Sequence, residues 1–448
     1  MSHILICAYS NPGHVTPMLA AGVHLAKLDH TITFHTAEVF RRKVEKAGLR
    51  FVGTTGKADF DYRNTGNLEG QENITLTERS NYFLKQTIAE ALPDLDRDLQ
   101  KILKESPVDL ILTSSMYFGA FPLLLRSGES RPPVIGCGVN PLMLSSVDCG
   151  PLSPPDNTPG GRQRIREATL QTQMAFAPMQ EALNGVLKKC SVPALSEFWL
   201  DAIYTLPDLV LQFSGEAFEF PRSDMPPHLR FVGPIVPALA DGFEEPAWWS
   251  ELDGSKPVIL VTQGTLANRN LDDLIQPALT ALANDNVLVI AATGRSDHEG
   301  LRIPANARVE SFVPFIQLLP KVDVMVTNGG FGAVQQCLSF GIPLVICGES
   351  EDKAFTAVRL GWSGAGINLK TGRPTVDQLH TAVHAVLANK SYQEQAERIQ
   401  KNIAQYNSLE EMSRHIDAAL THANQHAAAK KAPTQKTVTR IYHRSDKS

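Results

Sequence analysis

Short β-branched runs alternate with longer helical segments along most of the chain, and this alternation limits the possible fold more than any other feature. The runs of the first half are Ile4–Ala8, Thr31–His35, Leu110–Thr113, Val134–Gly138 and Leu209–Phe213. Those of the second half are Val258–Thr262, Val287–Ala291, Arg308–Ser311, Val322–Thr327, Leu344–Cys347 and Gly366–Leu369. Buried strands that are separated by helices form parallel sheets in α/β proteins. Because the alternation of strands and helices begins again at Val258, we expect two doubly wound, Rossmann-like domains.

The two series meet in a proline-containing, acidic stretch without a clear period. This stretch, 234–255, is the expected linker between an N-terminal domain at 1–233 and a C-terminal domain at 256–390. We expect 391–424 to form helices that pack back toward the N-terminal domain. The basic residues 425–448, with six Lys or Arg and one acid, are expected to be unfolded.

The composition excludes several classes of protein. The 448 residues are 43% apolar and 20% charged, as is typical of globular proteins. A net charge of −5 argues against a general affinity for nucleic acid or anionic membranes, so we expect small-molecule partners. The six cysteines contain no C-x-x-C pair, and no apolar stretch approaches the roughly 18 residues of a spanning helix. We therefore expect a cytoplasmic protein without structural zinc, a signal peptide or a transmembrane segment.

A turn that could carry chemistry follows the first predicted strand. His14 lies there, at the carboxyl end of a strand and the start of a helical segment, where open α/β sheets bind their ligands. The positive end of the helix dipole disfavours imidazolium, so His14 would be neutral and able to accept a proton. This placement favours His14 as a general base, and the alternative is that the turn only caps the helix.

Three turns of the second half carry groups that suit a phosphate or a sugar. The glycine-rich turn 327–332 follows a strand and precedes a helix, so its backbone amides could bind a diphosphate. It is neither a Walker A nor a G-x-G-x-x-G motif, and the alternative is tight packing of strand on helix. The turn 262–265 offers a hydroxyl and a glycine amide, and 348–353 offers an acidic pair that could accept hydrogen bonds from hydroxyls. Together with the His14 turn, they predict a cleft between two nucleotide-binding folds.

Two other patterns could bind metals but are better explained as surface residues. The spacings Asp59-x-Asp61 and Asp94-x-Asp96-x-Asp98 could hold Mg²⁺, but they lie away from the phosphate-like turns. His380 and His384 share a helical face, yet they lack the Glu of an H-E-x-x-H motif. We expect no metal.

Five motifs resemble those of a known family, over about residues 1–425. They are G-H-V-T-P-M at 13–18, F-V-P-F at 312–315, T-N-G-G-F-G at 327–332, G-E-S-E-D-K at 348–353 and W-S-G-A-G-I-N-L at 362–369. The chain resembles the family 1 nucleotide-diphospho-sugar glycosyltransferases, in the branch of the macrolide and UDP-glucosyl transferases. The resemblance implies the GT-B fold, in which two Rossmann-like domains face each other across a cleft.

The resemblance also implies roles for single residues. His14 would deprotonate the acceptor, Phe312 would stack on the base, and Asp352 and its neighbour would bind sugar hydroxyls. The implied donor-binding residues are Gly264, Thr265, Phe312, Val313, Asn328, Gly329, Gly330, Phe331, Gly332, Gln336, Glu351, Asp352 and Lys353. This sequence departs from the family pattern where Asn328 replaces a His, Gln336 a Glu and Lys353 a Gln. Ser114 stands where the family has the Asp that orients the catalytic His, and a serine would hold the ring less firmly.

The expected function is inverting, metal-independent transfer of glucose from UDP-glucose to a hydroxyl of a small lipophilic or phenolic acceptor. The nucleotide sugar would be a co-substrate, with no separate cofactor. A phenol, with a pKa near 10 like that of Tyr, gives its proton to a neutral imidazole more easily than an aliphatic alcohol does. Irregular N-terminal segments near 60–85 and 140–165, including the proline-rich loop 148–161, would form the acceptor walls.

Two alternatives remain open. Ser114 and Asn328 would also fit a catalytically impaired homologue that binds a nucleotide sugar or a partner enzyme. A sterol or lipid glycosyltransferase would need a membrane-binding amphipathic helix, and the sequence has no convincing example.

Overall fold

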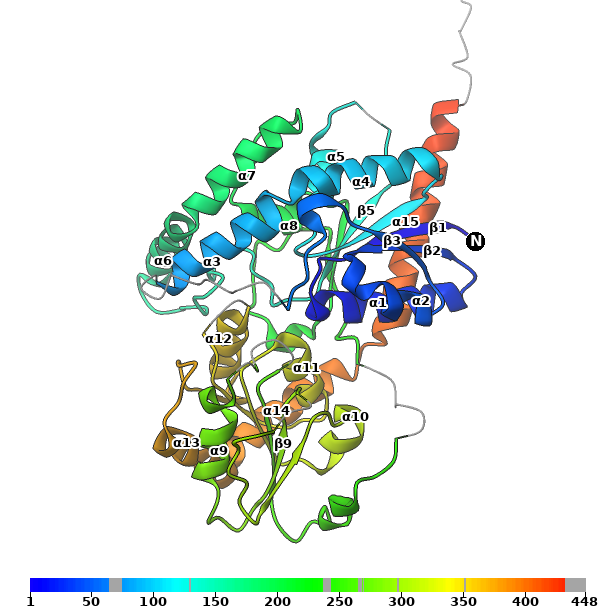
Figure 1. Ribbon diagram of the computed structural model, residues 1–448. Coiled ribbons are helices and arrows are strands. Elements are labelled where there is room, and N and C mark those ends of the chain that lie inside the picture. Colours follow the sequence, from blue (N-terminus) through cyan, green and yellow to red (C-terminus); the bar gives the residue numbers. More distant parts are fainter. Residues whose placement is uncertain are drawn as a thin grey trace, which may run out of the picture.

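The computed structural model of the chain contains two α/β domains, each built on one parallel sheet (Figure 1). The structure describes residues 1–63, 75–128, 130–236, 243–264, 268, 270–295, 298–349 and 352–431. In Figure 1 the N-terminal domain lies above the C-terminal domain. The expectation of two Rossmann-like domains is confirmed.

The N-terminal sheet has the strand order β3-β2-β1-β4-β5-β6-β7. Its strands are β1 (His3–Cys7), β2 (Thr31–Thr36), β3 (Arg50–Gly53), β4 (Leu110–Ser114), β5 (Val134–Gly138), β6 (Leu209–Gln212) and β7 (Leu229–Phe231). The chain leaves the centre of the sheet in both directions from β1, which is the doubly wound topology. The edge strands β3 and β7 were not predicted from the sequence. Both are short and partly exposed, so they lack a strong apolar signal.

The C-terminal sheet has the strand order β10-β9-β8-β11-β12-β13. Its strands are β8 (Val258–Thr262), β9 (Leu288–Ala292), β10 (Ala307–Glu310), β11 (Val324–Thr327), β12 (Leu344–Ile346) and β13 (Gly366–Asn368). Each was predicted to within two residues at either end. These strands are covered on both faces, so they are nearly continuous apolar runs that are easy to find in a sequence.

Helices cover the faces of both sheets (Figure 1). The N-terminal domain has α1 (Pro12–Lys27), α2 (Arg41–Lys46), α3 (Leu76–Leu84), α4 (Leu92–Glu105), α5 (Phe121–Leu125), α6 (Gly161–Ala175), α7 (Ala177–Lys189) and α8 (Trp199–Thr205). The C-terminal domain has α9 (Ile275–Ala281), α10 (Phe315–Leu318), α11 (Phe331–Ser339), α12 (Lys353–Ser363) and α13 (Val376–Ala388), and the chain ends with α14 (Lys390–Ile403) and α15 (Ser408–Lys431). The predicted loop 148–161 is irregular up to Gly161, where α6 begins. Within the described ranges, every helix is too short or too polar to cross a bilayer.

The last two helices join the cores of different domains. Ala396, Ile399 and Ile403 of α14 join the core of the C-terminal domain. Residues Met412 and Ile416 of α15 join the N-terminal core, and Figure 1 shows α15 returning along that domain. Helix α14 also contacts the N-terminal domain, because Oδ1 of its Asn402 accepts a hydrogen bond from the Ala217 amide at 3.0 Å. Helix α15 runs past 425, where an unfolded tail was expected, because the alanine-rich sequence there has a high helix propensity; residues 432–448 lie outside the described ranges.

A buried ion pair fixes α12 of the C-terminal domain to the N-terminal domain. The Arg359 guanidinium and the Glu219 carboxylate lie 2.6 Å apart, and their side chains are 0% and 1% exposed. Arg359 also donates a hydrogen bond to the carbonyl of Leu142 and lies over the ring of Phe220. Removing one partner of such a pair leaves an uncompensated buried charge, at a cost of about 3–5 kcal/mol. The start of α12, which carries part of the candidate site, is therefore firmly positioned.

Candidate active site

His14 lies in the first turn of α1, just beyond the carboxyl end of β1. The helix begins there because Asn11 accepts a hydrogen bond from the Gly13 amide at 2.9 Å and because Pro12 favours the first helical position. The ring of His14 is 5% exposed and meets the ring of Tyr9 edge-on, with 5.2 Å between the centroids. Burial lowers the pKa of His14 from 6.5 to about 3, so the imidazole is neutral. Neutrality was predicted from the helix dipole, but burial is its main cause.

The expected pairing of His14 with Ser114 is not formed. Nδ1 of His14 is buried and has no hydrogen-bond partner in the described part of the chain. The hydroxyl of Ser114 instead accepts a hydrogen bond from the Tyr9 amide, at 3.0 Å. A carboxylate that accepted a hydrogen bond from Nδ1–H would fix the tautomer with a free Nε2 and would stabilise the imidazolium form. No described residue does this for His14. His14 is thus a buried and unusually weak base.

A chain of polar contacts runs from the end of β4 to the C-terminal domain. The Ser115 hydroxyl donates to Oδ1 of Asn140 at 2.8 Å, and Nδ2 of Asn140 donates to the Asp352 carboxylate at 2.9 Å. Asn140 follows β5, and Asp352 directly precedes α12. Sequence reasoning missed Ser115 and Asn140, although a polar residue after the buried strand β5 was an available signal. The contact joins residues that are 212 positions apart, so only docking of the two domains reveals it.

The glycine-rich turn after β11 leaves the start of α11 open. Gly330 is the N-cap residue and provides no side-chain cap, so the first amides of the helix are left for another acceptor. Gly329 has a φ of +91°, and a Cβ atom at this position would lie 2.7 Å from the side chain of Ile346. Glycine is therefore required at 329. Gly332 is exposed, and the space beside its Cα is open. This arrangement suits a phosphate at the helix N-terminus.

Asn328 connects this turn to the turn after β8. Its Nδ2 donates a hydrogen bond to the carbonyl of Gln263. Gly264 has a φ of +76°, and a Cβ there would lie 3.3 Å from Asn328. An amide has two N–H groups, so Asn328 can hold the two turns together and still offer a second donor.

Three of the expected donor residues differ sharply in exposure. Phe312, which follows β10, is 77% exposed, and such an open ring suits stacking on a base. Val313 and Phe331 are buried in the core of the C-terminal domain. Their side chains cannot meet a ligand without repacking, so any contact from these two residues would come from main-chain atoms.

The remaining expected residues lie on α11 and at the start of α12. Gln336 is half-buried on α11. Lys353 is 7% exposed at the first position of α12, next to Asp352. Thr265 and Glu351 lie outside the described residues.

The two D-x-D spacings have ordinary ion-pair and hydrogen-bond partners. Asp61 pairs with Arg63, and Asp94 pairs with Arg97. Asp96 pairs with Arg126 at 2.7 Å, while Asp98 accepts hydrogen bonds from Thr55. These four carboxylates therefore have interaction partners within the protein.

Solved structures show which class of protein this fold defines. The calicheamicin glycosyltransferase CalG4 superposes with a TM-score of 0.72, at 20% identity, over 97% of this chain and 100% of that chain. A glycosyltransferase of kitacinnamycin superposes with a TM-score of 0.71, at 18% identity, over 93% of this chain and 98% of that chain. At such low identities the likeness concerns the fold alone. The fold is GT-B, the two-domain architecture of nucleotide-sugar glycosyltransferases.

Sequence comparison shows the family. The chain is 34% identical over 415 residues to 4'-demethylrebeccamycin synthase of Lentzea aerocolonigenes, covering 90% of this chain and 96% of the relative. It is 31% identical over 432 residues to UDP-glycosyltransferase 2 of Phaeomoniella chlamydospora, covering 93% of this chain and 95% of the relative. The family model "Erythromycin biosynthesis protein CIII-like, C-terminal domain" matches residues 276–418. The chain belongs to the family 1 glycosyltransferases and is a glycosyltransferase, as its motifs predicted.

Proposed function

We propose that the protein transfers glucose from UDP-glucose to a phenolic hydroxyl of a small lipophilic acceptor, with inversion at the anomeric carbon and without a metal. The observation that carries this proposal is that His14 is buried and neutral. The ring of His14 contacts Tyr9, whose amide donates a hydrogen bond to Ser114 at the end of β4. From that strand end, polar contacts continue through Asn140 to Asp352 of the C-terminal domain. The name of a further relative, UDP-glucosyltransferase B1 of Starmerella bombicola, 32% identical over 424 residues, supports the choice of donor. The structural neighbours include glycosyltransferases of calicheamicin and kitacinnamycin, which supports an acceptor of the natural-product type.

The proposed reaction is a single displacement. The acceptor oxygen attacks the anomeric carbon as His14 takes its proton, and the bond between that carbon and the diphosphate oxygen breaks. The bonding electron pair leaves with the diphosphate, whose charge the amides at the start of α11 stabilise. One displacement at one carbon inverts its configuration.

The weak basicity of His14 favours acidic acceptors. The pKa of His14 is about 3 in the site without an acceptor. A phenol has a pKa near 10, whereas water, which approximates an aliphatic alcohol, has a pKa of about 15.7. Ionising the phenol therefore costs about 8 kcal/mol less. An enzyme whose base lacks an orienting carboxylate gains most from an acceptor that gives up its proton easily.

The test is a transfer assay with UDP-glucose and pairs of acceptors that differ in the acidity of one hydroxyl, such as a naphthol and the matching naphthyl methanol. We expect the naphthol to give a β-glucoside, identified by mass spectrometry and by the coupling constant of the anomeric proton, and EDTA to leave the rate unchanged. Equal rates for the two acceptors would refute the preference for phenols. Binding of UDP-glucose without any transfer would instead support the catalytically impaired homologue, in line with the lack of a partner for Nδ1 of His14 among the described residues.

A further inference from the structure

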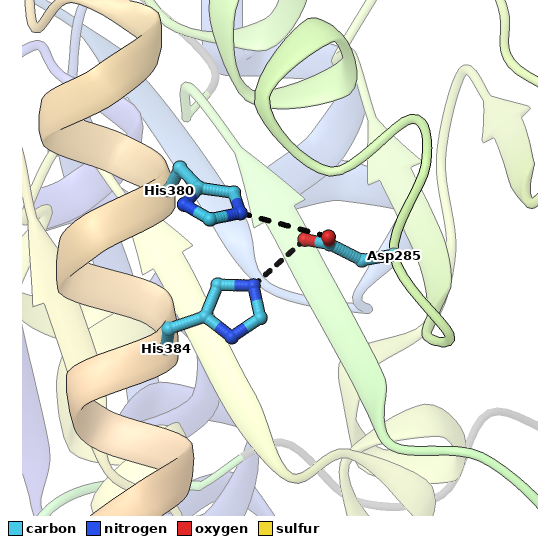
Figure 2. Close-up of side chains that lie close together, drawn as sticks. All are labelled: Asp285, His380 and His384. Carbon is cyan, nitrogen blue, oxygen red and sulfur yellow. Dashed lines mark hydrogen bonds and ion pairs between the residues drawn. The ribbon is translucent and has the colours of Figure 1, made fainter.

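Three metal-binding side chains meet on the C-terminal domain, outside the site described above (Figure 2). His380 and His384 stand four positions apart on α13, and Asp285 lies in the connection between α9 and β9. Nε2 of His384 is 2.9 Å from one carboxylate oxygen of Asp285, and Nε2 of His380 is 3.6 Å from the other. Figure 2 shows both imidazoles turned toward the carboxylate. The sequence offered only the histidine pair, and the fold supplies an acid 99 positions away from His384.

The spacing of the three groups matches a coordination sphere. The potential ligand atoms all lie within 4.8 Å of one another. Bonds of about 2.0–2.1 Å in a tetrahedral zinc site place neighbouring ligand atoms about 3.4 Å apart. The observed distances of 2.9 and 3.6 Å lie on either side of this value. Small rotations of the side chains would therefore admit an ion.

The backbone that presents the pair is well fixed. A neighbouring face of α13 buries Leu379, Val383 and Val386 in the core beneath it, and that core also includes residues of α9. Ligands on a packed helix keep their relative positions, which lowers the entropic cost of binding an ion. The imidazoles themselves are 47% and 45% exposed, so an ion can enter, and water can fill the remaining coordination positions.

We propose that Asp285, His380 and His384 bind one transition-metal ion such as Zn²⁺ or Ni²⁺, which links the α9–β9 connection to α13. Imidazole and carboxylate ligands suit Zn²⁺, Ni²⁺ and Cu²⁺, whereas Mg²⁺ and Ca²⁺ require sites made of oxygen. Asp285 precedes β9, so the site lies toward the amino end of the sheet. The candidate donor turns follow β8 and β11 at the carboxyl end. The ion therefore has a structural role and takes no part in glycosyl transfer.

The experiment uses the full-length protein without an affinity tag, freed of metal with a chelator. Titration calorimetry with ZnCl₂ should show a site of one equivalent, and Zn²⁺ should raise the melting temperature while Mg²⁺ does not. H384A and D285N should each weaken this binding about tenfold or more, because each removes or weakens one of three ligands. H422A, which removes an exposed histidine of α15, is the matched control and should bind as the wild type does.

The comparison requires that all three variants fold, which circular dichroism and unchanged transfer activity would show. Loss of the one-equivalent site in H384A and D285N, but not in H422A, supports the proposal. Zn²⁺ binding of equal affinity in all of these proteins overturns it, because the ion would then bind elsewhere. The absence of Zn²⁺ and Ni²⁺ binding in the wild type also overturns it, and leaves Asp285 as a simple hydrogen-bond acceptor for His384.

Discussion

The substitution Ser114→Asp tests whether the weak base limits the rate. Ser114 is 1% exposed and accepts the Tyr9 amide at 3.0 Å, and the ring of Tyr9 touches His14. An aspartate could accept the same amide with one oxygen and offer the other to Nδ1 of His14. A carboxylate beside the ring stabilises imidazolium and raises its pKa.

The size of the effect follows from the burial of His14. Its pKa has fallen from 6.5 to about 3, and reversing this shift corresponds to about 4.8 kcal/mol of imidazolium stabilisation. If the proton is half transferred in the transition state, about half of that energy, ~2.4 kcal/mol, lowers the barrier. We therefore expect kcat with a phenolic acceptor to rise by up to about 60-fold.

The assay is kcat/KM against pH for the wild type, Ser114→Asp and the uncharged control Ser114→Asn. The acidic limb, where activity is lost as the base becomes protonated, should move to higher pH in the aspartate variant only. Ser114→Asn should not gain activity, because it supplies no charge. A folded aspartate variant with lower activity and an unmoved acidic limb would refute the reasoning, and would show that position 114 does not reach Nδ1 of His14.

Four further predictions concern the same site and its surroundings. His14→Ala should lower kcat by at least about 100-fold while calorimetry shows unchanged UDP affinity; a smaller loss would remove His14 as the base. Phe312→Ala should weaken UDP binding by about 1 kcal/mol, about fivefold in Kd, and an unchanged Kd would place the base elsewhere. Asn140→Ala removes one hydrogen-bond partner of Asp352 and should raise KM for UDP-glucose without changing the Kd of UDP, which lacks the sugar; a parallel change in both would mean a general structural effect. Because the pKa of His14 is lowered in the folded state, the unfolded chain takes up the proton first below pH 6.5, so stability should fall by about 2.7 kcal/mol by pH 4.5. In urea unfolding at pH 7.5 and 4.5, His14→Gln should lack this part of the pH dependence, and equal losses in both proteins would contradict it.

The sequence by itself determined the central strands, the glycine-rich turn and the family. The central strands are continuous apolar runs, and the glycines of the β11 turn are set by local backbone geometry, so both are visible without knowledge of the fold. The family motifs are also local, since each lies within a few consecutive residues. The edge strands β3 and β7 were missed because their partly exposed residues carry little of that local signal.

Only the tertiary structure decided which groups meet. Among the described residues, Nδ1 of His14 has no hydrogen-bond partner, and the Ser114 hydroxyl accepts a hydrogen bond from the Tyr9 amide. The tertiary structure joined Asn140 to Asp352 across the two domains, and it brought Asp285 to the histidines of α13. A hydrogen bond or an ion pair depends on distances of a few tenths of an ångström between residues that lie far apart in the chain. Those distances are set by the packing of helices on sheets and of one domain on the other, which no local pattern of residues encodes.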